Sequence, residues 1–193
     1  MSIDVTPFRV APGEAADLRS RPTRIDELYD DKADYRRKLA KRKSRLYDLQ
    51  NRLFADDRYA VLAIFQAMDA AGKDGAIEHV MSAINPHGIT VHAFKQPSKE
   101  ELDHDFLWRT TAHLPERGRI AVFNRSYYEE VLVVRVHPEL LGGQRLPPGF
   151  GDHEAFWQQR FRSIGEHEAH LHRNGTRVGK FHLHLSADEQ RRR

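Results

Sequence analysis

Residues 66–75, with the sequence QAMDAAGKDG, contain residue types that bind phosphate. Backbone N–H groups at a helix start attract an oxyanion, a glycine lets the backbone approach it closely, and a lysine adds a full positive charge. The standard phosphate loop is G-x-x-x-x-G-K-[ST] between a strand and a helix. The matching positions here are Ala67, Gly72, Lys73 and Asp74, so two of the four fixed positions depart from the pattern. A buried-strand pattern before the stretch and a helical pattern after it favour a phosphate loop over an ordinary glycine turn with a surface lysine.

The departures from the standard loop change its expected chemistry. Asp74 has no hydroxyl group for Mg²⁺, which the usual Ser or Thr would provide. Asp69 places a carboxylate inside the loop, and carboxylate oxygens are ligands that Mg²⁺ accepts. We therefore expect Asp69 to hold Mg²⁺, to orient the attacking phosphate, or to do both.

A second candidate group follows the apolar segment 120–123. Asn124 stands where phosphate-loop enzymes often carry a carboxylate for magnesium, and Arg125 comes directly after it. Ligands of open α/β sheets bind at the carboxyl ends of the strands, and the planar guanidinium suits phosphate. A surface salt bridge is the alternative for Arg125, but its place at a strand end favours phosphate binding.

The elements that must position these residues alternate between apolar runs and helical patterns. A nearly continuous apolar run is typical of a parallel strand covered on both faces. This alternation predicts an α/β fold, a P-loop kinase-like three-layer sandwich with a mostly parallel sheet. The expected strands are 59–65, 89–94, 120–123 and 181–185, and the expected helices are 32–53, 75–81, 98–108 and 152–174. The first helix has an apolar stripe of Tyr35, Leu39, Leu46, Leu49 and Leu53.

Both ends of the sequence depart from this alternation. Residues 1–31 carry scattered prolines and no sustained periodicity, and we expect an irregular arm before a domain formed by residues 32–193. Ser186 and Glu189 have the spacing of a capping box, which predicts the start of a helix only a few residues before Arg193. We therefore expect a domain cut short just as an element begins.

Composition limits the class of protein. At 39% hydrophobic and 31% charged residues, the chain is expected to be a soluble globular domain. No apolar run has the length of a membrane span and no signal peptide is evident, so we expect a cytoplasmic protein without membrane contact. The absence of cysteine excludes disulfides and thiolate zinc sites. The basic cluster within 32–45 is most simply a solvated helix face, although it could attract a polyanion.

Two further ligand classes are less favoured by the sequence. The net charge is only +3 and no recognition motif is present, so we expect no nucleic-acid partner. Thiolate or carboxylate residues at a known zinc-site spacing do not accompany the histidine pairs His182/His184 and His167/His170, which disfavours a structural metal.

Several segments in order resemble the polyphosphate kinase 2 family, from about residue 30 to the end of the chain. They are 65–75 (FQAMDAAGKDG), 85–88 (NPHG), 94–97 (FKQP), 104–109 (HDFLWR), 123–129 (FNRSYYE), 133–137 (VVRVH) and 180–186 (KFHLHLS). The resemblance implies phosphoryl transfer between inorganic polyphosphate and a nucleotide, with Mg²⁺ as cofactor and AMP, ADP and ATP as partners. It also implies self-association into a homo-oligomer.

The resemblance assigns roles to individual residues. Asp69 is implied as the essential loop carboxylate and metal ligand, Lys73 as the loop lysine, and Arg125 as a phosphate contact. The implied polyphosphate-binding positions are Ala70, Ala71, Gly72, Lys73, Lys95, Arg109, Arg125 and Arg135. The implied nucleotide-binding positions are Asn124, Tyr128 and Glu129. Asn124 and Glu129 resemble the subgroup that phosphorylates both AMP and ADP, with Glu129 favouring AMP.

One departure from the family leaves other functions open. Family members continue beyond the position of Arg193 into a lid of helices rich in Arg and Lys, which covers the phosphates and limits hydrolysis. Without it, the chain could be an inactive fragment or only a polyanion-binding module. An ATP-dependent nucleotide kinase is a second enzymatic alternative, since such a kinase would use the same kind of α/β fold with a phosphate loop.

Overall fold

The structure is a computed structural model that describes residues 4–11, 13–151 and 153–193. Within these residues a single sheet has four parallel strands in the order β2-β3-β1-β4. The strands are β1 (Ala60–Ala67), β2 (Ile89–Ala93), β3 (Ile120–Asn124) and β4 (Thr176–Leu183). The predicted α/β class with a parallel sheet is confirmed.

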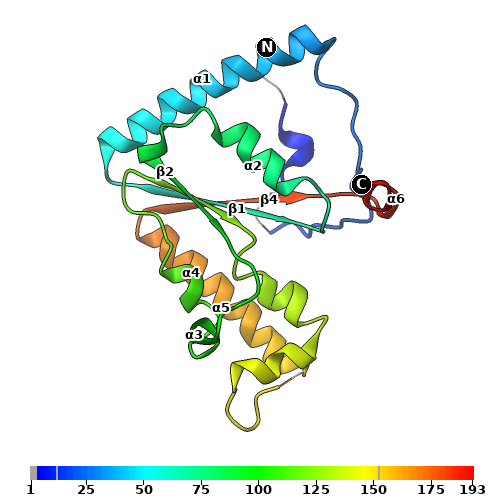
Figure 1. Cartoon of the computed structure of the whole chain (residues 1–193), viewed down its shortest axis with the longest axis vertical. Helices are drawn as coiled ribbons and strands as arrows, with labels where there is room; N and C mark the ends of the chain where they lie inside the picture. Colours follow the sequence, from blue (N-terminus) through cyan, green and yellow to red (C-terminus); the bar gives the residue numbers. More distant parts are fainter. Residues whose placement is uncertain (1–3, 12, 152) are drawn as a thin grey trace.

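Helices cover both faces of this sheet (Figure 1). One face carries α1 (Lys32–Asp56) and α2 (Lys73–Met81). The other carries α3 (Lys99–Leu102), α4 (Trp108–Thr111) and the long helix α5 (Glu154–Arg173). The expected three-layer arrangement is therefore present.

The apolar run of β1 is explained by these two covered faces. Side chains alternate across a strand, so an apolar residue at every position serves two cores. Leu62 and Ile64 belong to the core beneath α5, whereas Ala63 and Phe65 belong to the core beneath α1 and α2. Phe123 of β3 is fully buried in the first core.

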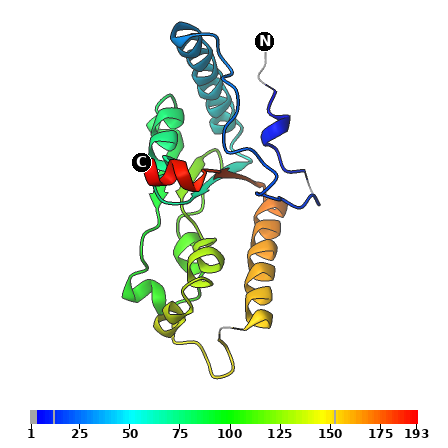
Figure 2. The same cartoon turned by 90° about the vertical axis from the view of Figure 1, so that its right-hand side faces the viewer.

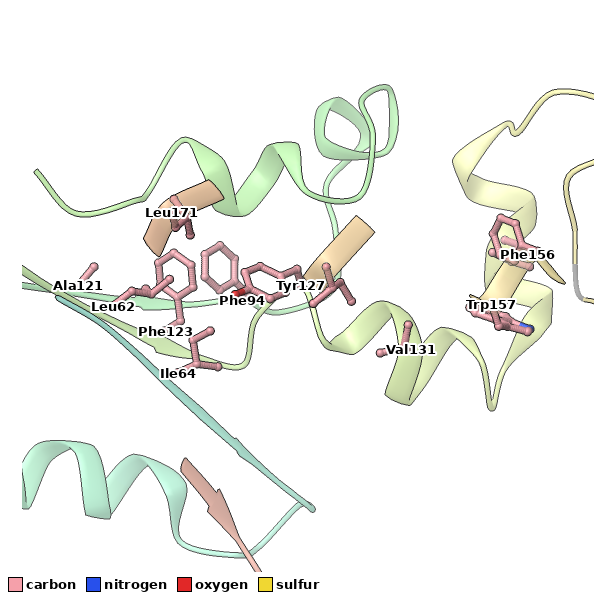
Figure 3. Packing of buried hydrophobic residues seen from close by; sticks show 12 residues of the cluster. Leu62, Ile64, Phe94, Ala121, Phe123, Tyr127, Val131, Phe156, Trp157 and Leu171 are labelled. Carbon is pink, nitrogen blue, oxygen red and sulfur yellow. The ribbon is translucent and has the colours of Figure 1, made fainter. Parts of the chain in front are cut away.

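The core beneath α5 extends beyond the sheet (Figure 3). Phe94 and Phe123 meet edge to face with ring centroids 4.9 Å apart, and Tyr127 lies beside them. Phe156 and Trp157 lie at the far end of the same core. This packing attaches the segment after β3, which contains Tyr127, to the rigid sheet.

Short helical turns complete the described structure. They are η1 (Thr6–Phe8), η2 (Pro86–Gly88), η3 (Glu130–Val134), η4 (Pro138–Gln144) and α6 (Ala187–Arg192). In α6 the Ser186 hydroxyl accepts from the N–H of Glu189, so the predicted helix start is confirmed.

Among the described residues, no helix combines the length and hydropathy needed to cross a membrane.

Local hydrogen bonds explain where the predicted helices were wrong. The capping box of Ser98 and Glu101 forms as expected, but the helix ends at Leu102 instead of continuing to Trp108. Asp105 accepts from the N–H of Leu107 at 2.9 Å, a side-chain bond that competes with the helical pattern. The predicted cap Asp152 lies outside the described residues, and the side chain of His153 accepts from the N–H of Phe156.

One strand boundary and the buried face of α1 also differ from the prediction. Strand β4 begins at Thr176, earlier than the predicted start at residue 181. In the apolar stripe of α1, Leu46 and Leu53 pack against the core, whereas Tyr35 and Leu49 are exposed.

Candidate functional site

The loop between β1 and α2 has the backbone of an anion site. Gly72, the N-cap residue of α2, has φ 81°, in the left-handed region that glycine adopts without strain. Because glycine has no side chain that could cap the helix, the first N–H groups of α2 keep their capacity to bind an anion. Ala70 also lies in the left-handed region, with φ 62°. For a residue with a Cβ this conformation is unfavourable, and such strain concentrates at functional sites.

Lys73 is a buried cation beside this loop. Its exposed fraction is only 8%, and no carboxylate in the described part of the chain pairs with its ammonium group. A buried charge needs a compensating partner. A phosphate bound in front of the loop would provide it.

Lys73 faces a cavity of about 520 Å³ at the carboxyl ends of β1 and β3. The cavity is lined by Asp69, Ala70, Ala71, Gly72, Lys73, Asp74, Gly75, Ala93, Phe94, Lys95, Asn124, Arg125 and Arg193. The structure thus brings most of the predicted site residues around one space, which we call the loop cavity.

Arg125 connects two carboxylates at the edge of the loop cavity. Its guanidinium donates to Asp69 at 2.6 Å and to Glu129 at 3.0 Å. Burial alone would lower the pKa of Arg125, but the bonds to Glu129 and Asp69 outweigh it and raise this pKa. Gln66 donates to the other oxygen of Glu129 at 3.1 Å. Arg125 thus forms ion pairs, and both Arg125 and its partner Asp69 line the loop cavity.

The backbone of Arg125 is itself unusual. Its φ is 65°, a left-handed conformation, and its N–H donates to the carbonyl oxygen of Phe65 at 3.0 Å. The chain thus turns sharply at the end of β3, which directs the guanidinium back toward the phosphate loop.

Sequence reasoning did not find the pairing of Asn124 with Asp74. The amide of Asn124 donates to the carboxylate of Asp74 at 2.6 Å, across the floor of the loop cavity. This bond joins the end of β3 to the first turn of α2. The only sequence signal for it was that both residues follow buried strands, Asn124 directly and Asp74 after the phosphate loop.

Helix α6 lies against the phosphate loop (Figure 2). Gln190 donates to the carbonyl oxygen of Asp69 at 3.1 Å, and Arg193 donates to that of Ala70 at 3.4 Å. Glu189 accepts from Arg193 at 2.8 Å and orients it. Arg193 adds a cation to the loop cavity that the sequence pattern alone did not assign.

A second cavity of about 730 Å³ adjoins the first and shares Phe94, Lys95 and Arg125 with it. Arg109 lies in its wall, where it donates to the carbonyl oxygen of Lys95 at 2.8 Å and pairs with Glu101. Apolar side chains from η3 and η4 and the carboxylates of Glu129 and Glu130 complete the lining. We call it the adjoining cavity.

Two predicted residues point elsewhere. The hydroxyl of Tyr128 donates to Glu168 at 2.7 Å, on the side of α5 and β4. Arg135 pairs with Glu154 at 3.2 Å. Neither Tyr128 nor Arg135 lines the loop cavity or the adjoining cavity.

The oxygen donors of the loop cavity fit a hard divalent cation. Asp69 is largely exposed at the rim, and only its Oδ1 is engaged by Arg125 among the described residues. Asp74 lines the same space. The described residues contain no group of three or more His, Asp or Glu placed to hold a metal alone. Mg²⁺ commonly uses one or two carboxylates together with substrate phosphates, which matches this set.

Comparison with known proteins identifies relatives of the whole chain. Residues 29–193 match the family described as Polyphosphate kinase 2 (PPK2). The chain is 58% identical over 193 residues to the ADP-polyphosphate phosphotransferase of Rhodopseudomonas palustris, covering 100% of this chain and 67% of that protein. It is 41% identical over 155 residues to the AMP/ADP-polyphosphate phosphotransferase of Meiothermus ruber, covering 80% of this chain and 54% of that protein.

Solved structures give the same result. The crystal structure of polyphosphate kinase 2 from Arthrobacter aurescens TC1 superposes with a TM-score of 0.84 at 36% identity, covering 98% of this chain and 64% of that chain. This chain therefore spans about two thirds or less of the length of these relatives.

Proposed function

The chain belongs to the polyphosphate kinase 2 family, and we propose that it transfers phosphoryl groups between inorganic polyphosphate and a nucleotide, converting AMP to ADP and ADP to ATP. The observation that carries the proposal is the loop cavity, where Lys73, Arg125 and Asp69 line one space that adjoins a second cavity. Two adjoining cavities that share the cations Lys95 and Arg125 suit a reaction between two phosphate-bearing substrates.

The loop cavity supplies the electrostatics of the proposed reaction. Phosphoryl transfer depends mainly on positioning and on stabilising charge at the oxygens of the transferred group. We place the end of the polyphosphate chain against the N–H groups of α2 and the ammonium of Lys73. The terminal phosphate of the nucleotide attacks the last phosphorus in line, a new P–O bond forms, and the bridging P–O bond to the shortened chain breaks.

The cation of Arg125 lies where the two substrates must meet. It lines both cavities, so its guanidinium can contact donor and acceptor phosphates together. Lys95 also lines both cavities, and Arg109 lines the adjoining one. These residues support the proposed basic path, with Ala70, Ala71 and Gly72 contributing the loop backbone.

Asp69, and Asp74 beside it, would hold the divalent cation that we propose to be Mg²⁺. When bound, the ion would neutralise charge on the phosphates of both substrates. Asp69 has a second task in the protein itself, since it orients Arg125. The cytoplasmic location and the self-association expected from the sequence stay predictions.

A donor exchange tests the proposed function. The protein is incubated with Mg²⁺, AMP or ADP, and either polyphosphate or ATP, and nucleotides are separated by ion-exchange chromatography. We expect ADP and ATP to form from polyphosphate. Turnover with ATP but not polyphosphate would instead support an ATP-dependent nucleotide kinase. Polyphosphate binding without product would support a polyanion-binding module.

Replacing Glu129 with glutamine tests the use of AMP. The carboxylate of Glu129 accepts from Gln66 and Arg125 and lines the adjoining cavity. A hydrogen bond to a charged group contributes a few kcal/mol at most, so we expect kcat/KM for AMP to fall roughly 10-fold relative to that for ADP. Steady-state rates with each acceptor at saturating polyphosphate measure this ratio.

Glu139→Gln is the matched control, because Glu139 lines the same cavity and has a largely exposed side chain. We expect it to leave the AMP-to-ADP ratio within about twofold of the wild type. An equal loss for both acceptors in Glu129→Gln would show that Glu129 supports catalysis generally and does not select AMP.

A further inference from the structure

A polar cluster centred on Glu168, which lines neither cavity, connects α5, β4 and the segment after β3. Glu168 of α5 has a side chain only 16% exposed, and its carboxylate accepts from Tyr127 at 3.0 Å and from Tyr128 at 2.7 Å. Lys180 of β4 donates to the second oxygen of Glu168 at 2.7 Å and to the hydroxyl of Tyr128 at 3.0 Å. We call these four residues the Glu168 cluster.

The cluster joins the segment that carries Arg125. Tyr127 and Tyr128 lie between Arg125 and Glu129 in the sequence, and Tyr127 is 2% exposed. Figure 3 shows its ring packed beside Phe94 and Phe123. The turn is therefore held by apolar packing at the ring of Tyr127 and by Glu168 at the two hydroxyls.

This attachment matters because the turn is strained. A non-glycine residue in the left-handed region is strained and persists only when its surroundings fix it. The bond from the N–H of Arg125 to Phe65 fixes the start of the turn. The two bonds to Glu168 fix its middle, and they orient the guanidinium only through the backbone.

The carboxylate of Glu168 has hydrogen-bond donors that stay protonated at neutral pH. A partly buried carboxylate needs donors, and here two hydroxyls and an ammonium group supply them. Burial raises the pKa of Tyr128 to about 12, and burial also raises the pKa of Tyr127. Both hydroxyls therefore stay protonated donors across neutral pH.

We infer that Glu168 is a positioning residue that holds the turn of Tyr127 and Tyr128 so that Arg125 reaches the loop cavity. Glu168 lines neither cavity, so it acts through Arg125 and does not contact the substrates. The inference rests on the proposed function, which assigns Arg125 to the phosphates.

A double-mutant cycle tests the inference. Glu168→Gln retains the size of the side chain but removes its charge. The two tyrosine hydroxyls, which share one carboxylate oxygen, then donate to a weaker neutral acceptor, and Lys180 loses its charged partner. We expect kcat to fall roughly 10- to 100-fold, as a small misplacement of a phosphate contact does, while KM for ADP changes less. In the Arg125→Lys background, which already lacks the guanidinium, the same substitution should lower kcat less than about twofold.

Equal losses of kcat in both backgrounds would overturn the inference, because they would show a general structural role. Glu166→Gln is the matched control, since Glu166 is an exposed residue of the same helix; we expect wild-type kcat. If Glu168→Gln fails to fold, as judged by its circular dichroism, Tyr127→Phe removes the single bond of that hydroxyl to Glu168 and is carried through the same cycle. Turnover by the wild type tests the proposed function separately, so failure of the cycle alone leaves that proposal intact.

Discussion

Replacing Lys73 with methionine is expected to lower kcat for polyphosphate-dependent phosphorylation of ADP by roughly 10³-fold or more, in line with the loss of one preorganised charge at a phosphoryl group. The ammonium group is buried beside the loop backbone, and no other cation in the loop cavity is as enclosed. Steady-state production of ATP from ADP and polyphosphate measures the loss.

Stability should move in the opposite direction from activity. Lys73 is a buried charge without an ion-pair partner among the described residues, and methionine fills a similar volume without a charge. We therefore expect Tm of the ligand-free variant to be equal to or higher than that of the wild type by differential scanning calorimetry. Added polyphosphate should raise Tm of the wild type but not that of the variant.

Lys99→Met is the control for this experiment. Lys99 is an exposed residue at the start of α3 and lines neither cavity. We expect its kcat to equal that of the wild type. A Lys73→Met variant that retains more than about a tenth of wild-type kcat would contradict the assignment, because a charge at the transferred group contributes more than that.

The positions of Asp69, Lys73 and Arg125 could be predicted because strand polarity decides them. Each follows a buried apolar run, and the carboxyl ends of parallel strands lie at one edge of a sheet. The continuous apolar run of β1 likewise predicted a strand covered on both faces, as its two cores show. These predictions needed only chain order and periodicity.

Residues after the turn could not be placed in this way. The left-handed φ of Arg125 reverses the chain, so the side chains that follow no longer alternate as in a strand. Tyr128 turns toward Glu168, and Arg135, beyond the π-helical turn of η3, turns toward Glu154. The partners of both residues lie on α5, far along the sequence, and no local pattern indicates them.

The pairing of Asn124 with Asp74 shows a second limit. In the sequence, Asn124 stands where a carboxylate is usual, and Asp74 stands where a Ser or Thr hydroxyl is usual. In the structure the two departures meet in one hydrogen bond of 2.6 Å. A contact between the end of β3 and the first turn of α2 depends on both residues together, so neither motif by itself predicts it.

Replacing Asp69 with asparagine is expected to lower kcat by roughly 10²- to 10³-fold and to raise the Mg²⁺ concentration needed for half-maximal rate. Asparagine keeps an oxygen that can accept from Arg125, as Oδ1 of Asp69 does at 2.6 Å, so the change removes mainly the charge. Because the side chain is largely exposed, we expect little change in Tm. Initial rates over a series of Mg²⁺ concentrations measure both effects.

Asp74→Asn separates the role of Asp69 from the general field of the loop cavity. Asp74 lines the same space, carries the same charge, and would still accept from Asn124 after the change. If negative charge anywhere in the cavity were sufficient, the two variants would lose equal rate and need equal Mg²⁺. If Asp69 holds the ion and orients Arg125, Asp74→Asn should lose at most about tenfold in kcat, whereas Asp69→Asn loses far more. Equal losses would assign the metal to both carboxylates and remove the special role of Asp69.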